Sequence, residues 1–345
     1  MKQLRRKSIQ ALAQSGEDPR SIYADVPRET YLDPGATRDS FRKVHPLTKN
    51  SVIIPTPPMT ETYEVVHDFI TCHRPGLFFI GDSTVGKTTA INAIIEVLPQ
   101  SFDNLPVLFF CANNHDAPTE RQLYRDMLRN IHHASSETGS ASQLRYRLMQ
   151  YCLAFANNLN SDRIILFVDE AQNYSEPDLT RLRDMSNELR INGLQLLTIF
   201  FGTSQLQFHA QSLRGHGRDD LLGRFLKYAH TFRGLRTRNE FRQTLAQYDD
   251  HEVFEYPSRS GIGITEFFMP HQFRSGWRLA QEHDQCYEAF LAGGADNSAS
   301  QYVAMQQFSE SVRNFLFYEW GTTEITAELS SDVWAQCVRR SRYGQ

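Results

Sequence analysis

Lysine is scarce in this sequence of 345 residues: six lysines stand against 30 arginines, and the formal net charge is −4. Arginine is preferred where a planar fork contacts carboxylates or phosphates, but a GC-rich genome produces the same excess. Composition alone leaves both explanations open. The charge is also uneven, because residues 1–50 carry +4, residues 205–242 carry +5 and residues 243–345 carry −7. A slightly negative total therefore does not exclude a basic surface.

Several other features are missing. The five cysteines form no CxxC pair and the twelve histidines form no HExxH motif, which argues for reduced thiols and against a disulfide scaffold or a zinc site. No apolar run approaches the ~18 residues of a membrane-spanning helix, and the first residues, MKQLRRKSIQ, lack the apolar stretch of a signal peptide. We therefore expect a soluble, cytoplasmic protein with no membrane partner.

From residue 76 onward, short apolar runs alternate with helical patterns, which is typical of a parallel sheet covered on both faces. The expected strands are residues 77–81, 107–111, 164–170, 194–203 and, more weakly, 229–235; the expected helices are residues 61–72, 87–98, 118–133, 141–158, 176–191 and 219–228. The sequence thus predicts an α/β fold with a parallel five-stranded sheet and flanking helices. We expect a mobile or peripheral arm over 1–50, the α/β core over 51–240, and a small helical subdomain with a short tail over 241–345.

One glycine-rich string carries the clearest chemistry. It matches GxxxxGK[ST] and runs Gly81-Asp82-Ser83-Thr84-Val85-Gly86-Lys87-Thr88, followed by Thr89 in the first turn of a predicted helix. Gly81 and Gly86 would let backbone N–H groups wrap phosphates, Lys87 would reach the β and γ oxygens, and the Thr88 hydroxyl would ligate Mg²⁺. The alternative is a glycine turn that binds nothing. The position directly after an apolar strand favours the phosphate-binding loop.

An acidic pair follows four apolar residues at the end of the third predicted strand. Asp169 would hold the magnesium ion, and Glu170 would act as the general base for the attacking water. A buried acidic pair can also be purely structural, but its place at a strand end favours the catalytic interpretation. No NKxD motif follows and no set of helicase motifs is present, so ATP is favoured over GTP.

Polar residues at the end of the next strand are candidates for sensing the γ-phosphate. Thr203 and Ser204 stand there, with capping of the following helix as the equal alternative. Arg224 is the leading candidate for an arginine finger supplied to a neighbouring subunit, where its charge would stabilise the transition state only after assembly. Arg218 and Arg214 compete with it, and an ordinary solvated arginine is the alternative for each. Arg278, in Gly-Trp-Arg, is a weaker candidate for the same phosphates.

Together, the Gly-Lys-Thr loop, VDEAQ, FFGTSQL and the GRF string resemble AAA+ ATPases over roughly residues 50–290. The DEAQNY form, the IPTPP stretch and the compact C-terminal region are similar to the TnsC/TniB family of transposition regulators, close to the ExeA secretion ATPases and phage Mu B protein. This resemblance implies ATP and Mg²⁺ as cofactors and a ring or helical filament of identical subunits on double-stranded DNA. It also implies a transposase and a TniQ-type target-selection protein as partners. By the same resemblance, Ile53, Ile54, Pro55 and Thr56 would line the adenine.

The resemblance further places DNA-binding basic residues in the segment after the second strand. Arg121, Arg125 and Arg129 lie there at helical spacings of four. The alternative is a solvated helix face paired with Glu120 and Asp126. Two other functions remain open: an AAA+ motor, either a DNA translocase or an ExeA-like secretion ATPase, and an ATP-switched signalling module that does not bind DNA.

Overall fold

A computed structural model describes residues 27–115, 118–293 and 302–343. The chain divides into two compact units. The α/β unit comprises residues 61–83 and 87–233; the helical unit comprises the described residues of 1–60 and 234–345, with which residues 84–86 are grouped. The N-terminal 26 residues of the expected arm lie outside the described part of the chain.

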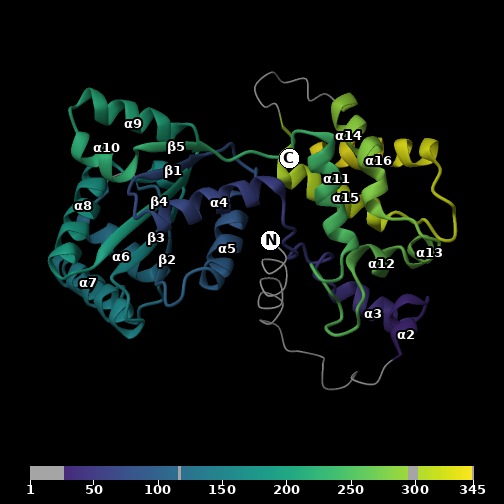
Figure 1. The fold of residues 1–345 in the computed structure, drawn as a ribbon, viewed down its shortest axis with the longest axis horizontal. Helices are drawn as coiled ribbons and strands as arrows, with labels where there is room; N and C mark the ends of the chain where they lie inside the picture. Colours follow the sequence, from purple (N-terminus) through teal and green to yellow (C-terminus); the bar gives the residue numbers. More distant parts are fainter. Residues whose placement is uncertain (1–26, 116–117, 294–301, 344–345) are drawn as a thin grey trace. The chain divides into compact units, whose positions relative to one another are not determined.

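The α/β unit contains the predicted parallel five-stranded sheet (Figure 1). Its strands are β1 (Leu77–Ile80), β2 (Val107–Cys111), β3 (Arg163–Asp169), β4 (Gln195–Gly202) and β5 (Tyr228–Thr231), in the order β2-β3-β4-β1-β5. All four neighbouring pairs are parallel, and the register places Ile80 opposite Gly202. The carboxyl ends of β1, β3 and β4 therefore meet at one edge, where ligands bind in open α/β sheets.

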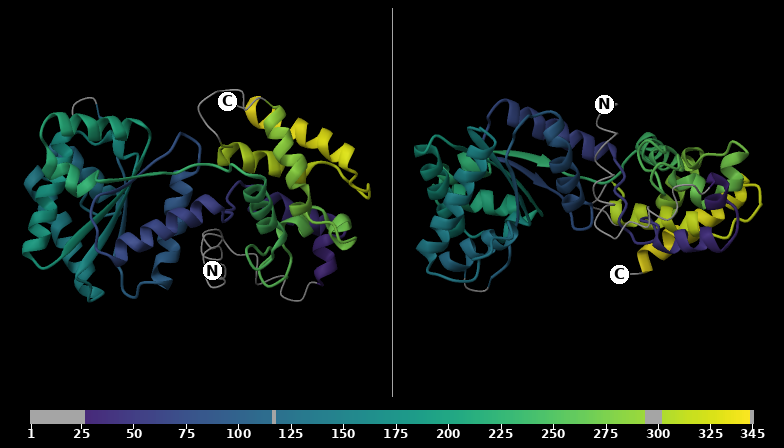
Figure 2. Two further views of the ribbon diagram at one scale, coloured as in Figure 1. Left: turned by 45° about the horizontal axis from the view of Figure 1, so that its top comes forward. Right: turned by 90° about the horizontal axis from the view of Figure 1, so that it is seen from below.

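Helices cover both faces of this sheet (Figures 1 and 2). These are α4 (Pro57–Thr71), α5 (Lys87–Val97), α6 (Glu120–Asn130), α7 (Ala141–Asn158), α8 (Glu176–Ile191), α9 (Gln205–Gly215) and α10 (Asp219–Phe225). Strand residues alternate between the faces: Phe78, Phe110 and Phe200 join the core formed with α6 to α10, whereas Phe79 and Phe201 stack on the opposite face with ring centroids 4.6 Å apart. Burial on both faces explains the continuous apolar runs.

The helical unit is built from both parts of the chain that flank the α/β unit. Its elements are α2 (Arg28–Leu32), α3 (Ala36–Val44), α11 (Arg238–Asp249), α12 (Ile264–Phe268), α13 (Pro270–Arg274), η4 (Leu279–Glu282), α14 (His283–Ala292), α15 (Met305–Phe317) and α16 (Ala327–Tyr343). One face of α15, formed by Phe308, Val312, Phe315 and Leu316, is fully buried. The indole of Trp334 stacks on Phe315 at 4.1 Å.

The N-terminal region differs from the expected arm. Residues 28–44 form α2 and α3, and Tyr31, Leu32 and Phe41 are buried in the core of the helical unit. The ring of Tyr31 meets that of Phe41 edge-on at 5.0 Å. Three large apolar side chains supply enough buried surface to fix short helices that the polar composition does not predict. The expected strand over 229–235 also ends early, at Thr231, because Leu235 instead forms an antiparallel bridge with Val303.

Among the described residues, no helix is long and apolar enough to cross a membrane. All five cysteines are free thiols. Burial raises the pKa of the Cys152 thiol to about 12, so this thiol stays protonated and unreactive at neutral pH.

His45 is a fully buried histidine in the helical unit. Its Nδ1 accepts a hydrogen bond from the Leu47 N–H at 3.0 Å, so the ring proton sits on Nε2, which has no partner among the described residues. Aromatic rings surround it, with centroids 4.7 to 5.7 Å away: Phe254, Tyr256, Phe267 and Phe268. Burial lowers the pKa of His45 from 6.5 to about 3. The imidazole is therefore neutral in the folded state.

We expect the helical unit to lose stability as the pH falls below 6.5. The unfolded chain takes up the His45 proton near pH 6.5 and the folded chain only near pH 3, so acid favours unfolding throughout that interval. The His45 contribution approaches about 1.4 kcal/mol per pH unit. Urea unfolding between pH 5 and 7 measures it, and all three tryptophans, Trp277, Trp320 and Trp334, report on this unit. His45→Asn keeps an acceptor for Leu47 and removes the titrating group; an unchanged slope in this variant would contradict the prediction.

Candidate nucleotide site

The glycine-rich loop connects β1 to α5 and holds its lysine inward. Thr84 and Gly86 both adopt left-handed backbone conformations, with φ of 67° and 98°. Alternating backbone hands of this kind form concave nests of N–H groups that suit anions. The Lys87 Nζ donates to the carbonyl oxygens of Gly81 at 2.9 Å and Asp82 at 2.8 Å. Burial lowers the pKa of Lys87, against the opposing effect of nearby carboxylates. The ammonium group is thus fixed in the loop that the sequence predicts for phosphate.

The first helical turn and the end of β3 bring the predicted metal ligands together. The Thr88 hydroxyl donates to Asp169 Oδ2, and the Glu170 N–H donates to Asp169 Oδ1 at 2.9 Å. Burial raises the pKa of Asp169, while these two hydrogen bonds act in the opposite direction. A hydroxyl and a carboxylate in contact are the oxygen ligands that Mg²⁺ prefers when phosphates and water complete its shell. No cluster of three or more His, Cys, Asp or Glu side chains suited to a metal occurs in the described ranges.

Glu170 stands immediately after β3 in a left-handed conformation, with φ of 51°. Its Oε2 accepts a hydrogen bond from Gln172 Nε2 at 2.5 Å. The Oε1 of the same amide accepts the Thr203 N–H at 3.1 Å. Gln172 therefore connects the candidate base to the end of β4. We did not assign Gln172 a role from the sequence, although the position of an amide two residues after the carboxylate was visible in VDEAQ.

The side chains of Thr203 and Ser204, which follow β4, do not cap the next helix, α9. Ser204 occupies the N-cap position of α9 but makes no capping hydrogen bond with its side chain. The buried Oγ1 of Thr203 has no partner in the part of the chain that the structure describes. An unsatisfied buried hydroxyl beside the Glu170 and Gln172 pair is compatible with the predicted sensor.

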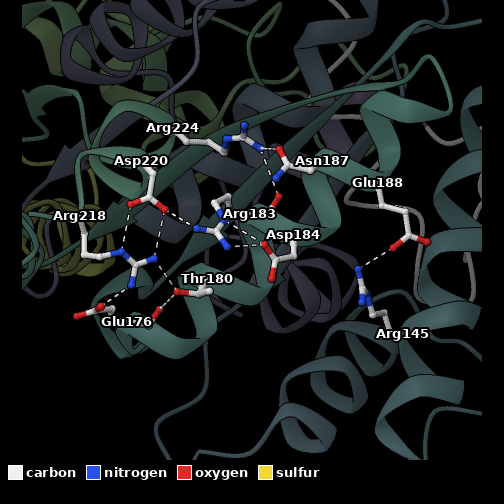
Figure 3. A network of polar contacts seen from close by, with 10 residues as sticks. All are labelled: Arg145, Glu176, Thr180, Arg183, Asp184, Asn187, Glu188, Arg218, Asp220 and Arg224. Atoms are coloured by element: carbon white, nitrogen blue, oxygen red, sulfur yellow. Dashed lines mark hydrogen bonds and ion pairs between the residues drawn. The ribbon is translucent and has the colours of Figure 1, made fainter.

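The three candidate finger arginines differ in how they are held; Figure 3 shows the contacts of Arg218 and Arg224. Arg218 contacts Glu176 at 2.5 Å and Asp220 at 3.1 Å, so neighbouring carboxylates neutralise it. Arg224 donates to Asn187 Oδ1 at 2.8 Å and makes no ion pair among the described residues. Burial and the like charges of Arg190 and Arg183 lower its pKa. Arg214 is exposed in the last turn of α9. Asn187, which orients Arg224, is a second residue without a role in the sequence analysis.

The arginines of α6 are engaged with their own chain. Arg121 donates to the carbonyl oxygens of Gly139 at 2.9 Å and Glu137 at 3.0 Å, and Arg129 pairs with the Glu137 carboxylate. Arg125 and Arg129 each lie 3.7 Å from Asp126. The alternative of a helix face paired with Glu120 and Asp126 is therefore correct for Asp126. The other partners come from the loop at 137–139 rather than from Glu120. These contacts hold the loop between α6 and α7 against the helix.

Five candidates for nucleotide contact, residues 53–56 and Arg278, belong to the helical unit. Ile54 is buried in its core; Ile53 and Pro55 are half-buried and Thr56 is buried. The guanidinium of Arg278 lies 3.6 Å from the ring centroid of Phe273 and donates to the carbonyl oxygens of Phe273 and Trp277. Their approach to adenine or phosphate stays a prediction.

The strand order β2-β3-β4-β1-β5, with a phosphate loop after the first strand and an acidic pair after the third, defines the AAA+ P-loop NTPase fold. Residues 72–208 match the family model of the AAA domain, and this range contains the loop, the acidic pair and Gln172.

Solved structures agree with this fold. The ORC2 protein of Aeropyrum pernix in its ADPNP–ADP complexes is 12% identical, with a TM-score of 0.57, over 87% of this chain and 72% of that chain. Its ADP form is also 12% identical, with a TM-score of 0.52, over 81% and 67%. At this identity the likeness is one of fold. No curated protein matches the sequence.

Proposed function

We propose that this protein binds ATP with Mg²⁺ and hydrolyses it. The observation that carries the proposal is the meeting of four side chains from two segments at one edge of the sheet: Lys87 and Thr88 at the start of α5, and Asp169 and Glu170 at the end of β3. This set supplies a cation for phosphates, oxygen ligands for a metal ion, and a base. The nucleotides named for the ORC2 complexes support the same ligand class.

Each residue has a separate task in this reaction. Lys87 exchanges its two carbonyl partners for phosphate oxygens and neutralises charge that develops there. Thr88 and Asp169 would hold Mg²⁺, which when bound offsets the negative charge of the β- and γ-phosphates. Glu170 orients a water and takes up its proton as the water attacks the γ-phosphorus, while the bond to the β-phosphate oxygen breaks and ADP leaves.

We propose that Arg224 completes the site of a neighbouring subunit, so that hydrolysis depends on self-assembly. Two observations support Arg224 over Arg218. Arg218 is neutralised by Glu176 and Asp220, whereas Arg224 rests on the neutral amide of Asn187 (Figure 3). An amide orients a guanidinium without competing for its charge as a carboxylate does. Moving the Arg224 guanidinium to a partner's phosphates therefore costs less free energy than moving that of Arg218, which must first leave two carboxylates.

The specific role that we propose is ATP-dependent assembly on double-stranded DNA to regulate transposition, with a transposase and a TniQ-type protein as partners. The support comes from the DEAQNY, IPTPP and GRF strings that resemble TnsC/TniB regulators, and from the positive segment at 205–242. A DNA translocase or secretion ATPase and a DNA-free signalling module use the same nucleotide site. These functions differ in whether the assembled protein binds DNA and in whether hydrolysis drives movement.

Electron microscopy and DNA binding with a slowly hydrolysed ATP analogue test this role. We expect rings or filaments on duplex DNA only when the analogue is present, with an affinity that falls steeply as salt rises. Oligomers that form equally well without DNA, with no salt-dependent DNA affinity, would favour the signalling module. Rapid hydrolysis coupled to directional movement along the duplex would favour the motor.

The α6 arginines provide a sharper prediction about the DNA contact. If Arg121 and Arg125 each contact one phosphate, replacing both with alanine should lower the slope of log affinity against log salt by about 1.8, because each contact contributes about 0.9. ATP binding should not change. Arg274→Ala is the control, since Arg274 is an exposed arginine paired with Asp33 in the helical unit, outside the positive segment. Because Arg121 anchors the loop at 137–139, the melting temperature is measured in parallel. An unchanged salt slope in a folded double variant contradicts the assignment.

A further inference from the structure

The side-chain amide of Gln172 is fixed in one orientation. The Thr203 N–H can only donate, so the atom that faces it at 3.1 Å must be the amide oxygen. The amide nitrogen is therefore turned toward Glu170, whose Oε2 lies 2.5 Å away. A hydrogen bond between an N–H group and a carboxylate is charge-assisted and stronger than a neutral one. The Gln172 amide thus holds one carboxylate oxygen of Glu170, and the backbone N–H of Thr203, just after β4, fixes the orientation of that amide.

Gly202 provides the space for this contact. A Cβ atom at position 202 would lie 2.6 Å from Gln172 Oε1, closer than two such atoms approach, and 3.1 Å from Leu206 Cδ2. Gly202 has no left-handed backbone angle, so conformational freedom does not explain the glycine. Its absent side chain instead lets the Gln172 amide lie against the strand. This accounts for the glycine of FFGTSQL by packing.

The same strand end also contacts the phosphate loop. The Gly202 carbonyl oxygen accepts the Gly81 N–H at 3.0 Å, where Gly81 is the first residue of the loop. The contacts therefore run from Gly81 to the end of β4 at Gly202 and Thr203, and from there through Gln172 to Glu170. Three hydrogen bonds and one close approach, that of Gly202 to Gln172, thus connect the loop to the base through the end of β4.

We propose that Gln172 is a positioning residue for ATP hydrolysis: it orients the Glu170 carboxylate and ties it to the end of β4 beside the phosphate loop. The inference rests on the proposed ATPase function and adds a residue that acts through Glu170 rather than on the nucleotide. The two hydrogen bonds of one amide and the clearance at Gly202 carry it.

Two substitutions at Gln172 separate its two hydrogen bonds. Gln172→Met keeps the length of the side chain and removes both bonds. Gln172→Glu keeps an acceptor for the Thr203 N–H but places a second carboxylate against Glu170. We expect kcat to fall by about 10- to 100-fold in both variants, which does not exceed the roughly 10²- to 10⁴-fold that a general base contributes. KM and the dissociation constant of the ATP analogue should change less than twofold, because no phosphate contact is lost. Activity retained in Gln172→Glu would show that only the Thr203 bond matters and would overturn the proposal.

Gly202→Ala tests the same geometry from the other side. The new methyl group displaces the flexible end of Gln172 and should reproduce the loss of kcat without touching Gln172 or Glu170 chemically. Gly215→Ala is the matched control, because a Cβ atom at that position meets nothing within 4 Å. Wild-type kcat in a folded Gly202→Ala variant would contradict the steric part of the argument.

A double-mutant cycle distinguishes positioning from a general structural effect. If Gln172 acts through Glu170, then Gln172→Met should not lower single-turnover hydrolysis further in a Glu170→Ala background. An equal additional loss in that background would overturn the proposal. The wild-type protein separates the two levels of inference: absence of ATP hydrolysis in wild type refutes the proposed function, whereas hydrolysis that Gln172→Met leaves unchanged refutes only the role of Gln172.

Discussion

Replacing Glu170 with glutamine is expected to lower kcat for ATP hydrolysis by about 10²- to 10⁴-fold. The amide keeps the shape of the side chain and can still contact Gln172, but it cannot take up the proton of the attacking water. Phosphate release or labelled-ATP hydrolysis measures the loss. Binding of the ATP analogue should remain within about threefold of wild type, because the residues expected to contact phosphate are unchanged.

The same variant also tests what hydrolysis is for. If hydrolysis drives disassembly, the Glu170→Gln protein should stay assembled with ATP for much longer than wild type. Asn173→Ala is a suitable comparison in the same 3₁₀ turn, because the Asn173 side chain donates to the Ala112 carbonyl oxygen rather than to Glu170. Faster disassembly of Glu170→Gln would contradict the assignment of Glu170 as the base.

Lys87→Ala should abolish nucleotide binding at ordinary concentrations and, with it, assembly. Hydrogen bonds to charged groups contribute roughly 1.5–3 kcal/mol each, so loss of two contacts to phosphate weakens ATP binding by about 100-fold or more. Isothermal titration or a fluorescent nucleotide measures this change.

Folding should survive this substitution. Burial lowers the pKa of Lys87, which means that the folded state already disfavours its charge. Alanine removes that unfavourable term together with the two hydrogen bonds to the Gly81 and Asp82 carbonyl oxygens, so we expect a melting temperature close to that of wild type. Lys227→Ala is the matched control, because Lys227 is an exposed lysine of the same unit that lies over the Tyr228 ring. Wild-type ATP affinity in Lys87→Ala would refute the nucleotide site.

The sequence predicts best where local signals and burial agree. The predicted segments 107–111, 141–158 and 176–191 coincide with β2, α7 and α8. Both helices begin at capping boxes, with Ser140 and Ser175 as the capping residues, so their starts are marked in the sequence itself. The phosphate loop and the acidic pair were equally visible, because their spacing from apolar strands is fixed by the fold.

The remaining features depend on contacts between distant residues. Gln172 acquires its role only when β4 places Thr203 beside it, and the amide carries no motif of its own. The partners of Arg121 lie in the loop at 137–139, so helical spacing within α6 could not identify them. The burial of Tyr31 and Phe41 could not be predicted from their polar segment, since the core that buries them is formed largely by residues beyond 234.

The burial of residues near both ends of the chain in one core has a consequence for protein synthesis. Every residue of the α/β unit has been made once the ribosome passes residue 233, so this unit can fold while translation continues. The helical unit cannot, because Tyr31, Leu32 and Phe41 must wait for Phe315 and Trp334. Until then, α2 and α3 expose apolar side chains on the nascent chain. The α2 and α3 residues are therefore made before the α/β unit but reach their folded positions only after it.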